Sequence, residues 1–127
     1  DRAYCVFDTD DDNRKNVIID EARKLAIKNN IDIITSTPSV ELWFLLHFDY
    51  TTSMMTNKKL MDKLKKYYPQ YNKNANIYLD INKYTLSAVK RAKMLEQYQL
   101  KNGNIIGTVE ANPNTEIYKI IEDLLNQ

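Results

Sequence analysis

The feature that most constrains the fold is a strand, a helix and a strand that follow one another at the start of the chain. Residues 3–8 form an apolar run without alternation, which is typical of a strand buried in a parallel sheet. Apolar residues at helical spacing predict a helix over 14–29, and 31–35 reads as a second strand. This order requires a parallel strand pair with a right-handed crossover. The helix is expected to face the sheet through Ile18, Ala22, Leu25 and Ala26.

The rest of the chain is predicted to be mainly helical. Helices are expected over 39–48, 57–68 and 82–101, with a last one that begins near 112–115. The last helix carries a regular apolar stripe of Ile117, Ile120, Ile121, Leu124 and Leu125. The predicted fold class is therefore α/β, a short parallel sheet with flanking helices and a helical C-terminal half.

Composition excludes several broad classes. The chain has 127 residues, of which 43% are hydrophobic, and this indicates one globular domain with a real core. The chain has 18 Lys and Arg and 17 Asp and Glu, so its net charge is close to zero. Any binding of nucleic acid must therefore depend on local patches of basic residues. The single cysteine, Cys5, is expected inside the buried first strand, which fits a reducing cytoplasm. The longest apolar run, about ten residues, is too short to span a bilayer, so no membrane partner is expected.

Acidic residues follow the first predicted strand. Asp8 and Asp10 are two residues apart, so on an extended strand end they project to the same side. Two such carboxylates can share a divalent cation, Mg²⁺ or Mn²⁺, with phosphate oxygens and water as further ligands. Asp11 and Asp12 add negative potential. Alternatively, residues 10–12 form only a solvated acidic turn before the helix.

Two further residues are candidates for catalysis. In an open parallel sheet, ligands bind at the carboxyl ends of the strands, and Glu41 follows the second strand just as Asp8 follows the first. Glu41 is therefore expected to approach the acidic pair, although an acid in a first helical turn also has a purely structural use. His47, the only histidine, could act as a general base or bind phosphate. Equally, it reads as a core histidine with one hydrogen bond, and Trp43 as a core residue.

Basic side chains lie on two of the predicted helices and could contact phosphates. They are Lys58, Lys59, Lys63, Lys65 and Lys66 in the first, and Lys83, Lys90, Arg91 and Lys93 in the second. Lysine-rich outer faces are also common on helices that bind nothing. A nucleic-acid partner is thus one interpretation of these helices, and a solvated surface is the other.

Three segments of the chain resemble the RloB-like family, bacterial proteins associated with restriction and abortive-infection loci. They are residues 6–11, residues 36–48 with the sequence STPSVELWFLLHF, and residues 112–118. That family is similar in pattern to Toprim-type domains, the metal-binding α/β module of topoisomerases, primases and defence nucleases. One departure is Thr37 before Pro38, where the family usually has an asparagine.

The resemblance implies a cytoplasmic, Mg²⁺-dependent nuclease of an antiphage system, acting on RNA or DNA, with a protein partner from a defence operon. Asp8 and Asp10 would match the metal ligands, with Glu41 and His47 as catalytic residues. Toprim domains also place a glutamate after an earlier strand. Residues 1–127 are therefore expected to be a single RloB-like, Toprim-like domain that lacks an N-terminal strand and helix of a longer protein.

Two other functions stay open on the sequence. The first is a non-catalytic sensor or partner-binding subunit of a defence complex, whose metal site is vestigial. The second is a receiver-like phosphotransfer module, since acidic strand ends also occur there. The absence of a lysine-bearing strand and the long helical C-terminal half count against this module.

Overall fold

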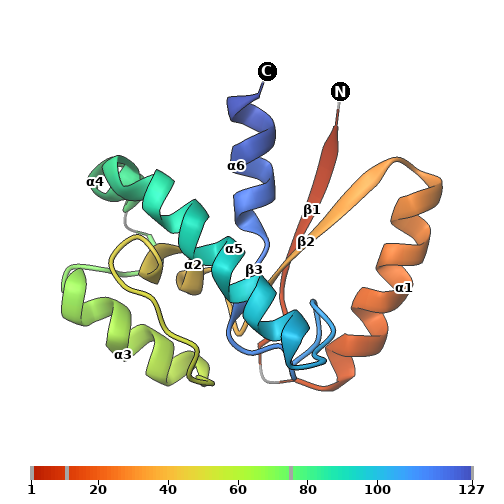
Figure 1. Cartoon of the computed structure of the whole chain (residues 1–127), viewed down its shortest axis with the longest axis horizontal. Coiled ribbons are helices and arrows are strands. Elements are labelled where there is room, and N and C mark those ends of the chain that lie inside the picture. Colours follow the sequence, from red (N-terminus) through yellow and green to blue (C-terminus); the bar gives the residue numbers. More distant parts are fainter. Residues whose placement is uncertain (1, 11, 75, 127) are drawn as a thin grey trace.

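A small three-stranded sheet lies between helices on both of its faces (Figure 1). The structure, a computed structural model, describes residues 2–10, 12–74 and 76–126. Its strands are β1 (Ala3–Asp8), β2 (Ile31–Thr37) and β3 (Asn114–Thr115), in the order β1-β2-β3. β1 and β2 are parallel, as predicted, whereas β3 is antiparallel to β2. The sheet is therefore mixed, and the prediction of a purely parallel sheet is wrong.

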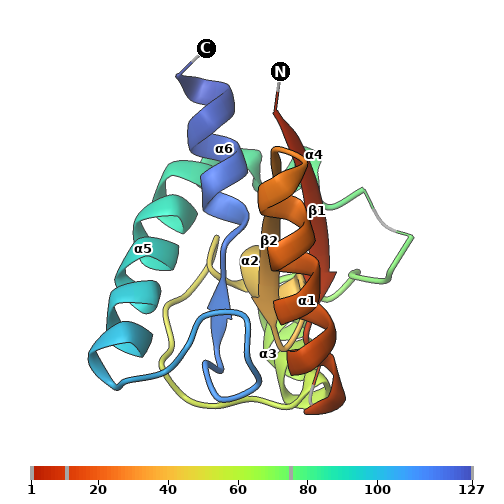
Figure 2. The ribbon, with the colours of Figure 1, turned by 90° about the vertical axis from the view of Figure 1, so that its right-hand side faces the viewer.

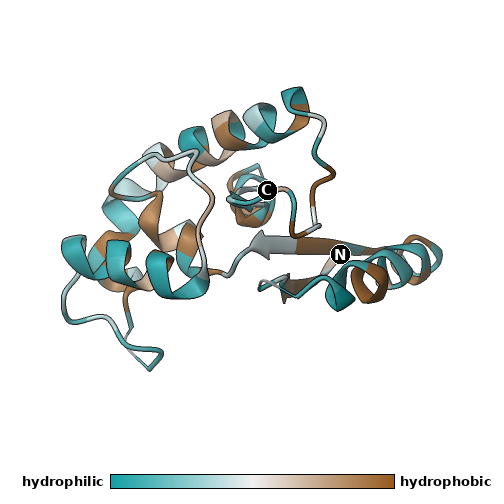
Figure 3. Ribbon diagram, turned by 90° about the horizontal axis from the view of Figure 1, so that it is seen from below, coloured by the Kyte–Doolittle hydropathy of each residue, from teal (hydrophilic) through white to brown (hydrophobic). Residues whose placement is uncertain are grey.

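Helices make up about half of the chain and form two layers. They are α1 (Arg14–Lys28), α2 (Glu41–Leu45), α3 (Asn57–Tyr67), α4 (Tyr78–Ile81), the 3-10 helix η1 (Asn82–Tyr84), α5 (Thr85–Lys101) and α6 (Ile117–Leu125). α1 covers one face of the sheet and α6 lies over the other, with α5 beyond it (Figures 2 and 3). In the described part of the chain, no helix is both long and apolar enough to cross a membrane.

The predicted elements exist, but several boundaries differ. α2 is shorter than the predicted 39–48, since the amide of Val40 bonds to Asp8 and the chain leaves the helix through a turn at 46–48. α5 begins at Thr85, after η1. α6 begins at Ile117 because the two residues of β3 pair with Ser36 and Thr37 before the helix starts. A two-residue strand has no periodicity that a sequence pattern could reveal.

β1 is an edge strand of the described sheet, not the buried strand that the sequence predicts. None of its residues is buried, three of the six are exposed, among them Cys5, and Val6 is 50% accessible. The cause is pairing on one side only, because the described residues offer β1 no neighbour other than β2. The unbroken apolar run of residues 3–8 therefore belongs to a strand that is not buried on both faces.

α1 packs through only part of the predicted face, because Ala22 and Ala26 lie in the core as expected but Ile18 and Leu25 do not. Ile19 and Ala26 are buried, whereas Ile18 and Leu25 are 59% and 63% exposed. The helix is turned so that Arg23, four residues after Ile19, points toward the interior, where it binds a carboxylate described below. An ion pair with a buried carboxylate and a partly exposed guanidinium thus holds the rotation of this helix against the sheet.

The main core lies beside the sheet, between α2, α3, α5 and α6. It contains Leu42, Trp43, Leu45, Leu46, Met55, Leu60, Ala88, Ala92, Leu95 and Tyr118. Trp43 is 6% exposed, which confirms it as a core residue. Burial of side chains of this size stabilises a fold by about 1.5–3 kcal/mol each. α2 is consequently held firmly, and its first residue, Glu41, is fixed beside the end of β1.

Candidate carboxylate site at the ends of strands β1 and β2

Asp8 ends β1 and lies at the carboxyl edge of the parallel strand pair, opposite Ser36 of β2. Its Oδ1 accepts a hydrogen bond of 3.0 Å from the amide of Val40, at the entrance to α2. Among the described residues, Oδ2 has no hydrogen-bond partner. Burial, followed by the negative charge of Glu41, raises the pKa of Asp8. The carboxylate of Asp8 therefore lies in a half-buried place with too little positive charge around it.

Glu41 is buried to 2% exposure and is fully partnered. Oε1 accepts from the hydroxyl of Ser39 at 2.8 Å, and Oε2 accepts from Tyr71 at 2.6 Å and from Lys73 at 3.0 Å. Burial acts to raise the pKa of Glu41, but the hydrogen bonds from these three donors outweigh it and lower the pKa overall. Glu41 is thus ionised at neutral pH, and its hydrogen bonds come from side chains rather than from the free amides of its own helix.

Asp10 does not extend the strand. Its φ is +53°, in the left-handed region, so the alternation expected of an extended chain stops at Asp8. Its carboxylate accepts hydrogen bonds from Lys15 and, at 3.0 Å, from the amide of Asn57. Burial would raise the pKa of Asp10, but the bonds from Lys15 and Asn57 lower it. The negative charge of Asp10 still acts on Asp8 and raises its pKa further.

The carboxylate oxygens at this edge are of the kind that a hard divalent cation takes as ligands. Within residues 2–10, 12–74 and 76–126, no three His, Cys, Asp or Glu side chains are grouped closely enough to hold a metal ion by themselves. Mg²⁺ nonetheless needs only one or two carboxylates when phosphate and water complete its shell. The ammonium groups of Lys15 and Lys73 lie on Asp10 and Glu41, so positive charge already stands beside these oxygens. Asp11 lies outside the described residues.

His47 lies in a different part of the molecule. Its Nδ1 donates to the carbonyl of Trp43 at 2.8 Å, and its Nε2 is 3.3 Å from the hydroxyl of Thr85. It lines an apolar cavity of about 450 Å³ between α2, η1, α5 and α6. Burial lowers the pKa of His47, so the ring is neutral at pH 7. The structure therefore brings Glu41 to Asp8, but not His47, whose catalytic role stays a prediction.

Four side chains of the site escaped the sequence analysis. Lys15 comes from the first turn of α1, Asn57 from the start of α3, and Tyr71 and Lys73 from the loop that follows α3. They reach Asp10 or Glu41 across up to 47 residues of chain. The loop was visible only as a polar stretch rich in Tyr, Asn and Lys. No motif or spacing links such residues to an acidic strand end.

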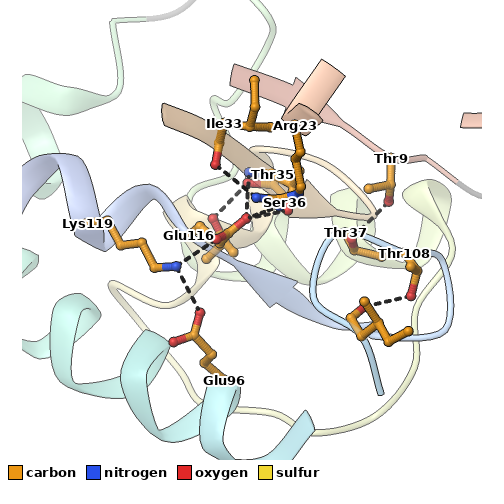
Figure 4. Close-up of polar contacts among 12 residues, drawn as sticks. Thr9, Arg23, Ile33, Thr35, Ser36, Thr37, Glu96, Thr108, Glu116 and Lys119 are labelled. Atoms are coloured by element: carbon orange, nitrogen blue, oxygen red, sulfur yellow. Dashed lines mark hydrogen bonds and ion pairs between the residues drawn. The ribbon is translucent and has the colours of Figure 1, made fainter. Parts of the chain in front are cut away.

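A second polar cluster surrounds Glu116, at the junction of β3 and α6 (Figure 4). Its Oε1 accepts hydrogen bonds from the amide and hydroxyl of Thr35, at 3.1 and 2.7 Å, and from Arg23 at 2.9 Å. Its Oε2 accepts from Lys119 at 2.7 Å. Because every acceptor is matched by a donor inside the fold, this cluster joins α1, β2 and α6 and serves structure.

Comparison with known proteins assigns the chain to a family. Residues 1–124 match the family model described as RloB-like protein, so the match includes Asp8, Asp10 and Glu41. Searches among curated proteins and among solved structures found no match. Because the family match spans almost the whole of the 127 residues, the chain belongs to the RloB-like family.

Proposed function

We propose that the protein is a metal-dependent nuclease that cleaves phosphodiester bonds of RNA or DNA in a cytoplasmic antiphage system. The observation that carries the proposal is the half-buried carboxylate of Asp8, which faces Glu41 at the carboxyl ends of two parallel strands. This edge is where open α/β sheets bind their ligands. The resemblance to Toprim-type domains, with Asp8 and Asp10 as metal ligands, agrees with this assignment.

The residues of the site have separable roles in this proposal. Asp8 and Asp10 hold the cation, and its binding offsets the negative charge that raises the pKa of Asp8. When bound, Mg²⁺ or Mn²⁺ would polarise a phosphate oxygen and acidify a bound water. Glu41, kept ionised by its three donors, adds a negative charge beside Asp8 and Asp10 that helps them to hold the cation. Lys73, whose side chain is 70% exposed, is free to turn from Glu41 toward a phosphate.

A nuclease assay with matched variants tests the proposal. Labelled RNA and DNA are incubated with the protein in Mg²⁺, in Mn²⁺ and in EDTA. We expect Asp8→Asn and Glu41→Gln to lower the cleavage rate by about 100-fold or more, and Glu110→Gln, an exposed control, to leave it unchanged. His47→Gln, assayed in parallel, tests the predicted role of the histidine. Equal cleavage by the wild type and the folded Asp8→Asn variant would reject the nuclease.

One observation favours a second function. Asp10 and Glu41 already carry lysine partners, as expected of a vestigial site in a sensor or partner-binding subunit of a defence complex. Isothermal titration with Mg²⁺ and Mn²⁺ separates the two functions. Saturable binding that disappears in Asp8→Asn supports the nuclease, and the absence of such binding supports the non-catalytic subunit.

A further inference from the structure

Helix α3 concentrates positive charge that the fold does not use. It carries five lysines and one acid, Asp62, which gives it a net charge of +4 in a chain whose total is +1. Four of the lysines are exposed and Lys63 is half-buried. Within the described ranges, none of the five forms an ion pair. The charged surface is made up of Lys58, Lys59, Lys63, Lys65 and Lys66, and we call it the α3 lysine surface.

Two features of these lysines weaken the helix that carries them. Lys59 lies four residues before Lys63, a like-charge pair that destabilises a helix by about 0.2–0.5 kcal/mol. Lys58 and Lys59 also stand in the first turn, where the helix dipole disfavours cations. Asp62, four residues from both Lys58 and Lys66, and the place of Lys65 and Lys66 in the last turn offset part of these costs. One acid cannot pair with five lysines, so the α3 lysine surface keeps a net charge of +4 that the fold does not use.

Both ends of α3 are tied to the carboxylate site. At its start, the side-chain amide of Asn57 bonds to Asp10 at 3.0 Å, and in the loop after its end Tyr71 bonds to Glu41 at 2.6 Å. The inner side of the helix packs Leu60 and Leu64, both fully buried, into the cores around α2. Figure 3 shows the outer side as hydrophilic. The α3 lysine surface is therefore held at a fixed position beside the carboxylate site.

We propose that a nucleic-acid strand lies along α3, with its phosphates on the α3 lysine surface and one phosphodiester at Asp8 and Glu41. This inference rests on the proposed function and adds the route by which substrate reaches the site. The 11 residues of α3 span about 16 Å, which matches about five phosphates of one strand. A lipid surface fits less well, because the apolar side of α3 is already buried in the core and cannot insert.

Binding measured without metal tests the inference separately from catalysis. Fluorescent single- and double-stranded RNA and DNA oligonucleotides are titrated in EDTA over a range of salt concentrations. The test variant is Lys59→Gln/Lys63→Gln/Lys66→Gln. The matched control is Lys24→Gln/Lys28→Gln/Lys101→Gln, three exposed lysines of α1 and α5, of which only Lys24 forms an ion pair among the described residues, with Asp20 of its own helix. Thermal unfolding confirms that both variants are folded.

We expect the α3 variant to bind oligonucleotides at least about tenfold more weakly. The magnitude of the slope of log K against log salt should fall by about 2–3, since each lost phosphate contact lowers that slope by about 0.7–0.9. Replacement of the same three lysines by arginine should retain binding. Equal affinity and slope for the α3 and control variants would overturn the inference, as would binding to anionic vesicles or polyglutamate but not to any oligonucleotide. If oligonucleotides bind through the α3 lysine surface but are not cleaved, the proposed nuclease activity is rejected and this inference stands. If the α3 variant cleaves as fast as the wild type, this inference is rejected and the nuclease stands.

Discussion

The phenol of Tyr71 donates a 2.6 Å hydrogen bond to the carboxylate of Glu41, which lies 30 residues earlier in the chain. The bond closes the loop after α3 onto the first residue of α2. Burial and the hydrogen bond to Glu41 both raise the pKa of Tyr71, so the phenol stays protonated and remains a donor at neutral pH. The loop and the candidate site are therefore one structural unit.

Tyr71→Phe should expose how much this bond contributes. The variant keeps the ring in its place among Leu64, Tyr68 and Ile77 and removes only the hydroxyl. We expect a loss of about 1.5–3 kcal/mol in the free energy of unfolding, because a buried carboxylate loses a donor. Urea unfolding at pH 7 measures it.

The control for this variant is Tyr78→Phe, at a tyrosine that is 60% exposed and makes no hydrogen bond to a described residue. It should change the unfolding free energy by less than about 0.5 kcal/mol. In Tyr71→Phe, the pKa of Glu41, followed by NMR, should also rise. An unchanged unfolding midpoint and an unchanged pKa would contradict the role given to Tyr71.

Lys15→Met tests the cation beside Asp10. On the proposed metal site, the ammonium of Lys15 competes with a divalent ion for the carboxylate of Asp10. A partly exposed ion pair contributes about 0.2–1 kcal/mol, and Mg²⁺ no longer has to replace it in the variant. Mg²⁺ should therefore bind up to about fivefold more tightly. Isothermal titration measures the affinity, and Lys24→Met on the same helix, which pairs with Asp20 away from the site, should not alter it. Weaker binding in Lys15→Met would show that the lysine supports the site.

Topology made part of the site predictable. The strand, helix and strand at the start of the chain place the ends of β1 and β2 at one edge, so the meeting of Asp8 with Glu41 follows from residue order alone. The position of Asp10 did not follow. Its backbone is left-handed, and its carboxylate binds Lys15 and Asn57, the second of which lies 47 residues away.

The remaining errors of the sequence analysis share this physical origin. The rotation of α1 is set by the bond between Arg23 and Glu116, which lie 93 residues apart. Hydrophobic periodicity cannot predict this contact, because it reports only the spacing of nearby apolar residues. β3 exists because Ser36 and Thr115 bond through their hydroxyls across the sheet. Patterns with periods of 2 or 3.6 residues report local structure, whereas these features depend on pairs of polar side chains distant in sequence.

The buried Glu116 should make the stability of the protein depend on pH. Burial would raise the pKa of Glu116, but the hydrogen bond and charge of Lys119, with help from Thr35 and Arg23, lower it below the ordinary 4.5. A carboxylate with a depressed pKa in the folded state stabilises the fold above its unfolded pKa, and that contribution is lost as pH falls through the folded value. Urea unfolding between about pH 3 and 7 follows the loss.

The variant Glu116→Gln isolates this contribution. At pH 7 it should cost about 1.5–3 kcal/mol, because Arg23 and Lys119, which are themselves partly exposed, lose their charged hydrogen-bond partner. The difference between the wild type and the variant should then shrink as pH falls below about 4.5, once the wild-type carboxylate is protonated. Glu110→Gln, an exposed control, should show a small difference that does not vary with pH. A Glu116→Gln deficit that stays constant down to pH 3 would exclude the charge of Glu116 as the cause.

Two glycines with left-handed backbones offer a test of how firmly Arg23 is held. Gly103 and Gly107 have φ values of +76° and +91°, so alanine is strained at both. A Cβ at Gly103 meets nothing within 4 Å, whereas one at Gly107 would lie 2.8 Å from Nη2 of Arg23. That nitrogen is the one that bonds to Glu116. Although a guanidinium is normally free to move aside, here it can do so only by leaving its partner.

We therefore expect Gly103→Ala to cost about 1 kcal/mol in unfolding free energy, from backbone strain alone. Gly107→Ala should cost about 1.5–3 kcal/mol more, because it displaces a charge-assisted hydrogen bond. Combination of Gly107→Ala with Arg23→Met in a double-mutant cycle should recover most of that excess, since no guanidinium is left to displace. Equal costs for the two alanines would mean that Arg23 yields freely, and the bond to Glu116 would then not be what sets the rotation of α1.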